Sequence, residues 1–155
     1  MKKICIFIIL FFCVYGVASF FNDYIAQYEE IQGKSMEPAF QDGDHTLISQ
    51  LPFFFSEPQR FDIIAFSWEH ELYVKRIIGL PGEIVAIKDG NIYINGQILP
   101  ENYGKEEMND TLEPMHLKEN EYFVLGDNRN FSEDSRSKDM GAITKEQIKG
   151  KVLFK

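Results

Sequence analysis

The stretch LYVKRIIGLPGEIVAIKDGNIYINGQIL, from Leu72 to Leu99, contains the strongest evidence for the fold class. Its β-branched and aromatic residues come in short runs separated by turn-forming residues, a pattern typical of β-strands. The pairs Asp89-Gly90 and Asn95-Gly96 favour the tight turns of antiparallel hairpins, because these residue types tolerate a positive φ. The stretch therefore predicts consecutive antiparallel strands.

Similar runs occur on both sides of this stretch, and no internal repeat or compositional change suggests a second folded domain. These runs are HTLISQ, FDIIAF, EYFVLGD and KVLF. The segment TKEQIKG predicts one short helix, with Thr144 as its N-cap, Gln147 completing a capping box and Gly150 after its end. Residues 101–120 are polar and acidic and predict a long surface loop. We therefore expect a small all-β domain with one short C-terminal helix.

The N-terminal segment ICIFIILFFCVYGVASFF, from Ile4 to Phe21, contains no charged residue. As a helix it would extend ~27 Å, close to the ~30 Å hydrocarbon core of a bilayer. Lys2 and Lys3 precede it and acidic residues follow it, which predicts a cytoplasmic N-terminus by the positive-inside rule. We expect residues 1–21 to form a cytoplasmic stub and transmembrane anchor, and residues 22–155 an extracytoplasmic domain. The protein would then be a single-pass protein of the cell membrane.

A cleaved signal peptide is the alternative, because Val17-Ala18-Ser19 has the small residues of a cleavage site. The apolar run exceeds the ~7–15 residues of a typical signal-peptide core, which favours the anchor. Both cysteines, Cys5 and Cys13, lie in this run, so the rest of the chain can form no disulfide.

The overall charge and the histidines exclude some function classes. The formal net charge of −8 argues against a nucleic-acid partner, because phosphate contacts need clustered lysine and arginine. His45, His70 and His116 are scattered and form no HExxH motif, so we expect neither a metal nor another cofactor.

Three segments contain candidate catalytic residues. Ser35 lies in GKSMEPAFQDGD, between turn-permitting residues. Lys75 lies in the apolar strand around YVKRII, where a charged amine is costly to bury, so it must pair, reach solvent or lose its proton. The third segment is GDNRNFSEDSR, residues 126–136, which is dense in carboxylates, arginines and hydroxyls.

Together these segments resemble the bacterial type I signal peptidases in their minimal Gram-positive form, which are membrane-anchored serine proteases with a Ser/Lys dyad. SMEPAF is similar to the segment that carries the family's nucleophile, and YVKRIIGLPGE is similar to the segment that carries its lysine. GDNRNFSEDSR, called the third motif below, fits the family's pattern GDNRxxSxDSR. The resemblance covers nearly the whole chain. It implies a signal-peptidase-like β-barrel or sandwich and a serine endopeptidase that removes signal peptides from exported preproteins.

The resemblance also implies roles for individual residues. Ser35 would attack the peptide bond, with its own backbone N–H in the oxyanion hole, and Lys75 would take and return the proton. Ser132 would orient the Lys75 amine by a hydrogen bond. The supporting ion-pair network would consist of Arg76, Asp127, Asp134 and Arg136.

The substrate would be an extended signal peptide that ends in small residues of the A-x-A type. We expect it to add as a strand between the segment before Ser35 and the strand before Lys75. The expected substrate-binding residues are Gly33, Met36, Tyr73 and Val74. Further expected partners are membrane lipid and the secretion translocon, and the aromatic segment Leu51–Phe55 is either core or a tip that rests on lipid.

The chain departs from the family pattern at a few positions. Phe61 stands where the family usually has glycine, Ala39-Phe40 replaces Thr-Leu, and Met140 stands where an aromatic residue is frequent. Gly33 also removes a serine hydroxyl that some members use in the oxyanion hole. Three alternatives stay open: a catalytically inactive or specialised paralogue in surface-protein assembly, a self-cleaving Ser/Lys repressor, and a Ser/His/Asp hydrolase.

Overall fold

The computed structural model describes residues 2–24, 27–101, 103–104 and 108–154. One α-helix precedes a β domain that contains three short 3-10 turns. In chain order the elements are α1 (Lys2–Tyr24), β1 (Gln27–Glu30), β2 (His45–Ser49), η1 (Leu51–Phe54), β3 (Ile63–Trp68), β4 (Glu71–Gly79), β5 (Ile84–Lys88), β6 (Asn91–Ile94), β7 (Gln97–Ile98), β8 (Leu112–His116), β9 (Glu121–Leu125), η2 (Arg129–Phe131), β10 (Ile143–Thr144), η3 (Lys145–Gln147) and β11 (Ile148–Phe154).

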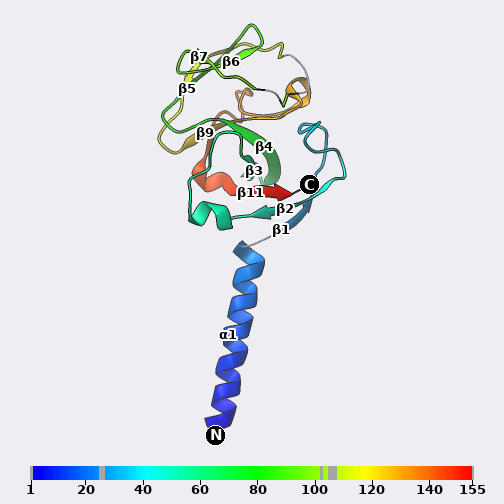
Figure 1. Ribbon diagram of the computed structural model, residues 1–155, viewed down its shortest axis with the longest axis vertical. Helices are drawn as coiled ribbons and strands as arrows, with labels where there is room; N and C mark the ends of the chain where they lie inside the picture. The colour runs from blue at the N-terminus through cyan, green and yellow to red at the C-terminus, as the bar shows by residue number, and fades with distance from the viewer. Residues whose placement is uncertain (1, 25–26, 102, 105–107, 155) are drawn as a thin grey trace.

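The strands form two antiparallel sheets, which confirms the prediction of a mainly β fold. The larger sheet has the order β1-β2-β11-β3-β4-β9-β10, and the smaller sheet has the order β7-β6-β5-β8. The smaller sheet is inserted between β4 and β9 in sequence and lies at the end of the domain farthest from α1 (Figure 1). Within the described ranges each sheet keeps two edge strands, so the predicted barrel is not closed.

The hairpin turns of the smaller sheet form where the sequence predicts them. Asp89 and Gly90 both have positive φ angles, 49° and 75°, and so do Asn95 and Gly96, 51° and 81°. Two consecutive residues with positive φ give the turn whose twist matches that of paired strands. The turn chemistry of this segment therefore predicted β5, β6 and β7 correctly.

Buried apolar residues form three clusters. The first joins the two sheets, because Ile78 and Phe123 come from β4 and β9 of the larger sheet, and Val85 and Ile92 from β5 and β6 of the smaller one. Two further clusters support the larger sheet; one includes Met140, and the other includes Met36, Phe40, Ile48 and Val152. Phe40 and Met140, two of the departures from the family pattern, are thus buried core residues.

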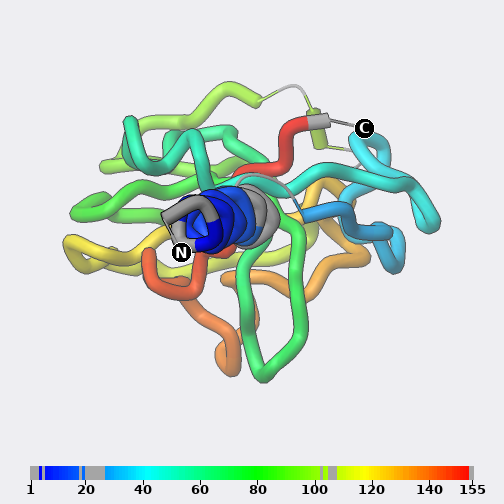
Figure 2. Tube along the Cα trace, turned by 90° about the horizontal axis from the view of Figure 1, so that it is seen from below, coloured from blue at the N-terminus to red at the C-terminus, as the bar shows by residue number. Residues whose placement is uncertain are grey.

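The N-terminal segment is helical, as predicted, and projects away from the β domain. Figure 2 views α1 end-on against the face of the domain from which it leaves. Its described apolar side chains are exposed from Ile4 to Val17. No helix within the described ranges combines the length and apolar character required to cross a membrane. The predicted transmembrane anchor is therefore not confirmed.

The predicted C-terminal helix is wrong beyond its first turn. The capping box between Thr144 and Gln147 forms, but it closes only the 3-10 turn η3. From Ile148 the chain is extended, because β11 fills the place between β2 and β3 in the larger sheet. A Cβ at Gly150 would lie 2.8 Å from atoms of Ile48 and Ser49, so this glycine permits close strand packing and does not end a helix.

The loop predicted for residues 101–120 is also partly wrong. Leu112–His116 forms β8, which pairs with β5 at the edge of the smaller sheet. This strand is mostly exposed, so its sequence lacks the apolar alternation that would have predicted it. Residues 102 and 105–107 of the predicted loop lie outside the described residues.

Candidate active site

The loop that carries Ser35 is tied down at both ends. Ile31 and Asp44 are linked where the Ile31 N–H donates to the Asp44 carbonyl at 2.7 Å. Within the loop, the Gly33 N–H donates to Asp42 Oδ1 at 2.7 Å, and Gly33 has a φ of 85°, which glycine adopts without strain. Met36, next to Ser35, is 1% exposed. The serine is therefore held on a fixed turn.

Lys75 lies in the middle of β4 and points to this turn. It pairs with Ile64 of β3 in register, and it is only 3% exposed. Its Nζ lies 2.8 Å from Ser35 Oγ and 3.2 Å from the Val74 carbonyl oxygen. The two residues predicted to react together are thus in hydrogen-bond contact.

The surroundings of Lys75 favour its neutral form. Burial lowers the pKa of Lys75 to about 8, although the charges of Asp134 and Glu133 partly oppose this by favouring the ammonium. Within the described ranges, neither carboxylate forms an ion pair with this amine. An appreciable fraction of Lys75 is therefore neutral in mildly alkaline solution and can accept a proton from the Ser35 hydroxyl.

The third motif contacts the backbone on both sides of the serine side chain. The Asn128 N–H donates to the Ser35 carbonyl at 3.0 Å, and Asn128 Nδ2 donates to the Lys34 carbonyl at 3.0 Å. Sequence reasoning missed Asn128, since nothing local indicates that it lies against a segment so distant in the chain. Its position between Asp127 and Arg129 in the third motif was the only available signal.

Arg76 and Asp127 form a bidentate ion pair, as the predicted network requires. Arg76 Nε and an Nη donate to the two Asp127 oxygens at 2.8 and 2.6 Å, and Asp127 is fully buried. A second Arg76 Nη donates to the Phe61 carbonyl at 3.0 Å. Phe61 has a φ of 73°, so it adopts the backbone conformation that glycine would favour at this position.

Asp134 and Arg136 form the second ion pair of the network. Arg136 Nε donates to Asp134 Oδ1 at 2.8 Å, and the other Asp134 oxygen accepts from the Gly126 N–H at 3.0 Å. Arg136 also donates to the Arg129 carbonyl at 2.6 Å. The four predicted supporting residues therefore bind the third motif to itself and to β4, away from direct contact with the Ser35 hydroxyl.

Ser132 does not make the hydrogen bond expected of it. Its Oγ is buried and has no hydrogen-bond partner among the described residues, so the expected bond to Lys75 is absent. Gly126 allows its close approach, because a Cβ there would lie 2.2 Å from Ser132 Oγ and 2.5 Å from the Ser35 carbonyl oxygen. Ser132 thus lies beside the backbone of Ser35 with a free hydroxyl.

Sequence reasoning also missed a second layer behind the ion pairs. Arg129 is 2% exposed and forms an ion pair with Glu101. The Tyr103 ring lies under the Arg76 guanidinium at 4.3 Å and against the Phe61 ring at 5.5 Å. Glu101 and Tyr103 come from the segment predicted to be a loop, whose sequence gives no sign of this contact.

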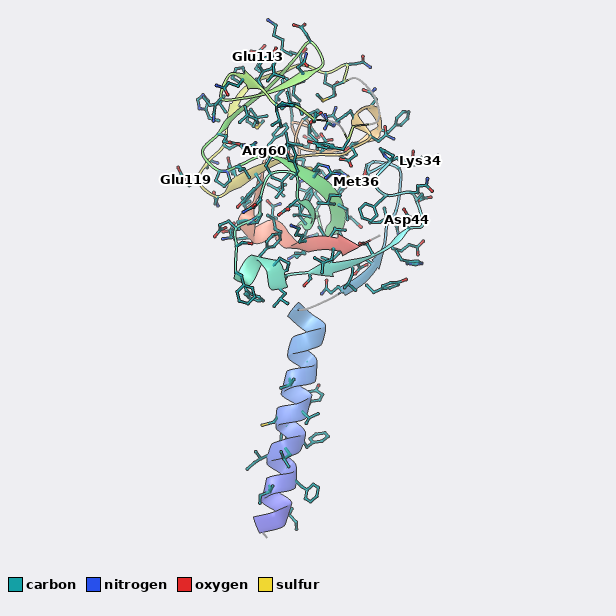
Figure 3. The ribbon with its side chains drawn as sticks, viewed as in Figure 1. Lys34, Met36, Asp44, Arg60, Glu113 and Glu119 are labelled. Carbon is teal, nitrogen blue, oxygen red and sulfur yellow. The ribbon has the colours of Figure 1, made fainter. Side chains whose placement is uncertain are left out.

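A cleft of about 400 Å³ opens beside Ser35 and Lys75. All four predicted substrate-binding residues line it: Gly33, Met36, Tyr73 and Val74. Figure 3 shows Lys34 and Met36, two residues of the cleft lining, on the same side of the domain. All three histidines are exposed, and none lines the cleft. In the described part of the chain, no three His, Cys, Asp or Glu side chains form a metal-binding group.

Comparisons with known proteins identify the family of this chain. The family model described as "Signal peptidase, peptidase S26" matches residues 4–155. A signal peptidase I of Bacillus amyloliquefaciens is 37% identical over 80% of this chain and 72% of its own length. A probable signal peptidase I of Synechocystis sp. is 34% identical over 85% of this chain, which spans 63% of that relative.

A solved structure is similar as well. A signal peptidase I from Enterococcus faecalis is 38% identical, with a TM-score of 0.54 over 63% of this chain and 97% of that one. The prediction of a type I signal peptidase, a serine endopeptidase, is thereby confirmed at the level of the family. The chain belongs to the signal peptidase family, peptidase S26.

Proposed function

We propose that the protein cleaves signal peptides from exported preproteins after A-x-A-like sites, with Ser35 as nucleophile and Lys75 as general base. The observation that carries this proposal is the 2.8 Å contact between the buried Lys75 amine and the Ser35 hydroxyl. An alcohol is a weak nucleophile without an adjacent base, and a lysine acts as a base only in its neutral form.

The reaction begins with neutral Lys75. Its Nζ takes the Ser35 proton while Ser35 Oγ attacks the scissile carbonyl and forms a tetrahedral intermediate. The resulting ammonium then protonates the leaving amine, and the C–N bond breaks to leave an ester on Ser35. In the second half, Lys75 takes a proton from water as the water attacks the ester. It then returns this proton to the Ser35 oxygen as the ester C–O bond breaks and the new C-terminal carboxyl group of the signal peptide is released.

The oxyanion of the intermediate needs donors that already point to it. We assign this role to the Ser35 N–H. Gly33 supplies no hydroxyl for a second contact. The free Ser132 hydroxyl lies close to the Ser35 backbone, and we assign it the stabilisation of the Lys75 ammonium after a change of rotamer.

The substrate would lie extended in the cleft between the segment before Ser35 and the first half of β4. Residues 71–74 of β4 pair with β3 on one side, whereas β9 pairs with β4 only from Arg76 onward. Their second edge therefore has no strand partner in the described part of the chain and can bond a peptide backbone. Alternate side chains of that peptide would enter the shallow pockets beside Gly33, Met36, Tyr73 and Val74.

We further propose that the protein works at a membrane, with residues 1–21 as anchor, the domain from residue 22 outside, and the secretion translocon as neighbour. The exposed apolar side chains of α1 support lipid contact. The turn η1 lies at the end of the β domain from which α1 leaves (Figure 1), with Phe54 57% and Phe55 84% exposed. These two rings would rest on the lipid surface.

Cleavage by isolated membranes tests the proposed activity. Membranes with the wild type should cleave a preprotein with an A-x-A site, membranes with Ser35→Ala should not, and Ser56→Ala serves as the matched control. Cleavage by Ser35→Ala would exclude the proposed nucleophile. A folded wild type that cleaves nothing would favour the inactive paralogue.

The anchor is tested separately. The intact protein should remain in the membrane after an alkaline carbonate wash, and protease added outside should digest only the part after Phe21. A released protein whose N-terminal sequence starts at Phe20 would show instead that Val17-Ala18-Ser19 is a cleavage site.

A further inference from the structure

The walls of the active-site cleft are acidic. The lining carries four carboxylates, Glu29, Glu30, Glu71 and Glu133, against the amines of Lys34 and Lys75. In the reactive form, Lys75 is neutral, so among the described residues of this lining Lys34 is then the only cation opposing the four carboxylates. The cleft therefore presents a net negative charge to any peptide that enters it.

These carboxylates are available to a substrate. Within the described ranges, none of the four forms an ion pair with a lysine or arginine, whereas Glu57, Glu83, Glu101 and Glu121 all do. Glu30, Glu71 and Glu133 are exposed, and Glu29 is half-buried. Their field reaches Tyr73, which also lines the cleft: the pKa of Tyr73 is raised, first by burial and then by the charges of Glu133, Glu71 and Glu69.

The carboxylates of the two walls lie at a defined distance from the dyad along the chain. Glu71 precedes Lys75 by four positions, and Glu30 precedes Ser35 by five. A substrate strand beside β4 advances ~3.3 Å per residue, as β4 itself does, whereas the other wall is a strand only up to Glu30 and a loop from there to Ser35. Because the residues before the cleavage site would lie beside residues 71–74, Glu71 lies opposite the substrate residue about four positions before the scissile bond. Glu29 and Glu30 line the same cleft from the other wall.

We propose that Glu29, Glu30 and Glu71 make the protein select signal peptides with lysine or arginine, and reject those with aspartate or glutamate, at the fourth or fifth residue before the cleavage site. This inference rests on the proposed function and adds a charge preference to it. Opposite charges across an open cleft attract modestly, and like charges repel by a similar amount, so the preference is one of degree.

Matched peptides test the preference. Three peptides share one A-x-A site and differ only in Lys, Gln or Glu at the fourth residue before it. The full-length wild-type protein in detergent at low ionic strength should cleave the Lys peptide with a kcat/KM about tenfold above that of the Glu peptide, with Gln between them. High salt should reduce this ratio, because it screens exposed charges.

Charge-removing variants assign the preference to the cleft. The triple variant Glu29→Gln/Glu30→Gln/Glu71→Gln should reduce the Lys-to-Glu ratio to within about twofold. The control variant Glu113→Gln/Glu119→Gln/Asp139→Asn removes the same number of charges away from the cleft and should keep the wild-type ratio. Glu113 and Glu119 lie apart from Lys34 and Met36 in Figure 3.

The possible results separate this inference from the proposed function. Equal rates for the three peptides, or a ratio that survives in the triple variant, would overturn the charge preference while cleavage of the Gln peptide upholds the activity. A wild type that cleaves no peptide would overturn both.

Discussion

The Lys75 amine lies 2.8 Å from the Ser35 hydroxyl although the two residues are forty positions apart in sequence. Each is fixed by a different part of the fold. Lys75 is held by the pairing of β4 with β3, and Ser35 by the Asn128 bonds to its own carbonyl and to that of Lys34. Such fixed geometry is what proton transfer between two side chains requires.

Replacement of the dyad should abolish cleavage without loss of the fold. Lys75→Ala removes the proposed base. Lys75→Arg should be equally inactive, because a guanidinium keeps its proton at any working pH. We expect a loss of at least about a thousandfold in kcat for each. Peptide cleavage measures the loss, and circular dichroism checks that each variant is folded.

The histidines provide the control for this prediction. A variant with His45, His70 and His116 all replaced by glutamine should retain activity within about an order of magnitude, because none lines the cleft. A folded but inactive triple variant would refute the lysine as base and favour a histidine mechanism.

The activity should rise with pH through the pKa of Lys75, which is lowered to about 8 by burial. Below this pH the amine is protonated and cannot accept the Ser35 proton, so kcat/KM falls. Glu133→Gln removes a charge that stabilises the ammonium, so it should lower this pKa and move the acid limb to lower pH. Glu69→Gln, outside the cleft, is the control. An acid limb near ~6.5 that disappears with one histidine would contradict the assignment.

Local signals in the sequence were sufficient for much of the fold. Asp89-Gly90 and Asn95-Gly96 predicted their hairpins because a turn depends on only a few adjacent residues. The capping box at Thr144 was also read correctly, but the sheet overrode the helix that it predicted. Ile148 begins β11 and does not continue a helix, because this segment pairs with β2 and β3, which lie on either side of it in the sheet. No local sequence pattern predicts such long-range pairing.

The candidate site, like the fold, was predictable only where a recognisable sequence motif was present. The motif resemblance indicated Ser35, Lys75 and the two ion pairs, and the structure brings them together. It gave no reason to expect that Tyr103 lies under Arg76 or that Glu101 pairs with Arg129. These contacts join the segment between β7 and β8 to β4 and the third motif, residues 126–136. They depend on tertiary packing and not on sequence spacing.

Ser132→Ala should separate catalysis from stability. The Ser132 hydroxyl has no hydrogen-bond partner among the described residues, so its removal should change the free energy of unfolding by less than about 0.5 kcal/mol. If the hydroxyl turns to the Lys75 ammonium during the reaction, kcat should fall by roughly tenfold to a thousandfold with little change in KM. Urea unfolding and steady-state kinetics measure the two effects. An unchanged kcat would exclude the proposed role.

Gly126→Ala should damage both the fold and the activity. The new methyl group would lie 2.2 Å from Ser132 Oγ and 2.5 Å from the Ser35 carbonyl oxygen, so the third motif must move away from Ser35. We expect a loss of about 1–3 kcal/mol in the free energy of unfolding. We also expect at least about a hundredfold loss in kcat, from displacement of Ser35, the proposed nucleophile. Gly104→Ala, where the nearest atoms lie at 3.8 Å, should change neither greatly. Full activity in Gly126→Ala would show that the close packing of these segments is dispensable.

The backbone at Phe61 should prefer glycine to alanine. Phe61 has a φ of 73°, a conformation that costs a residue with a Cβ about 1 kcal/mol and costs glycine almost nothing. Phe61→Gly and Phe61→Ala both remove the ring that packs on Tyr103. The difference between the two variants therefore measures the contribution of the backbone conformation to the free energy of unfolding. We expect the glycine variant to be more stable by about 1 kcal/mol, the reverse of the usual order in a strand or helix. Urea unfolding of both variants measures the difference. An alanine variant as stable as the glycine variant would mean that this segment relaxes to a negative φ and releases the Phe61 carbonyl from Arg76.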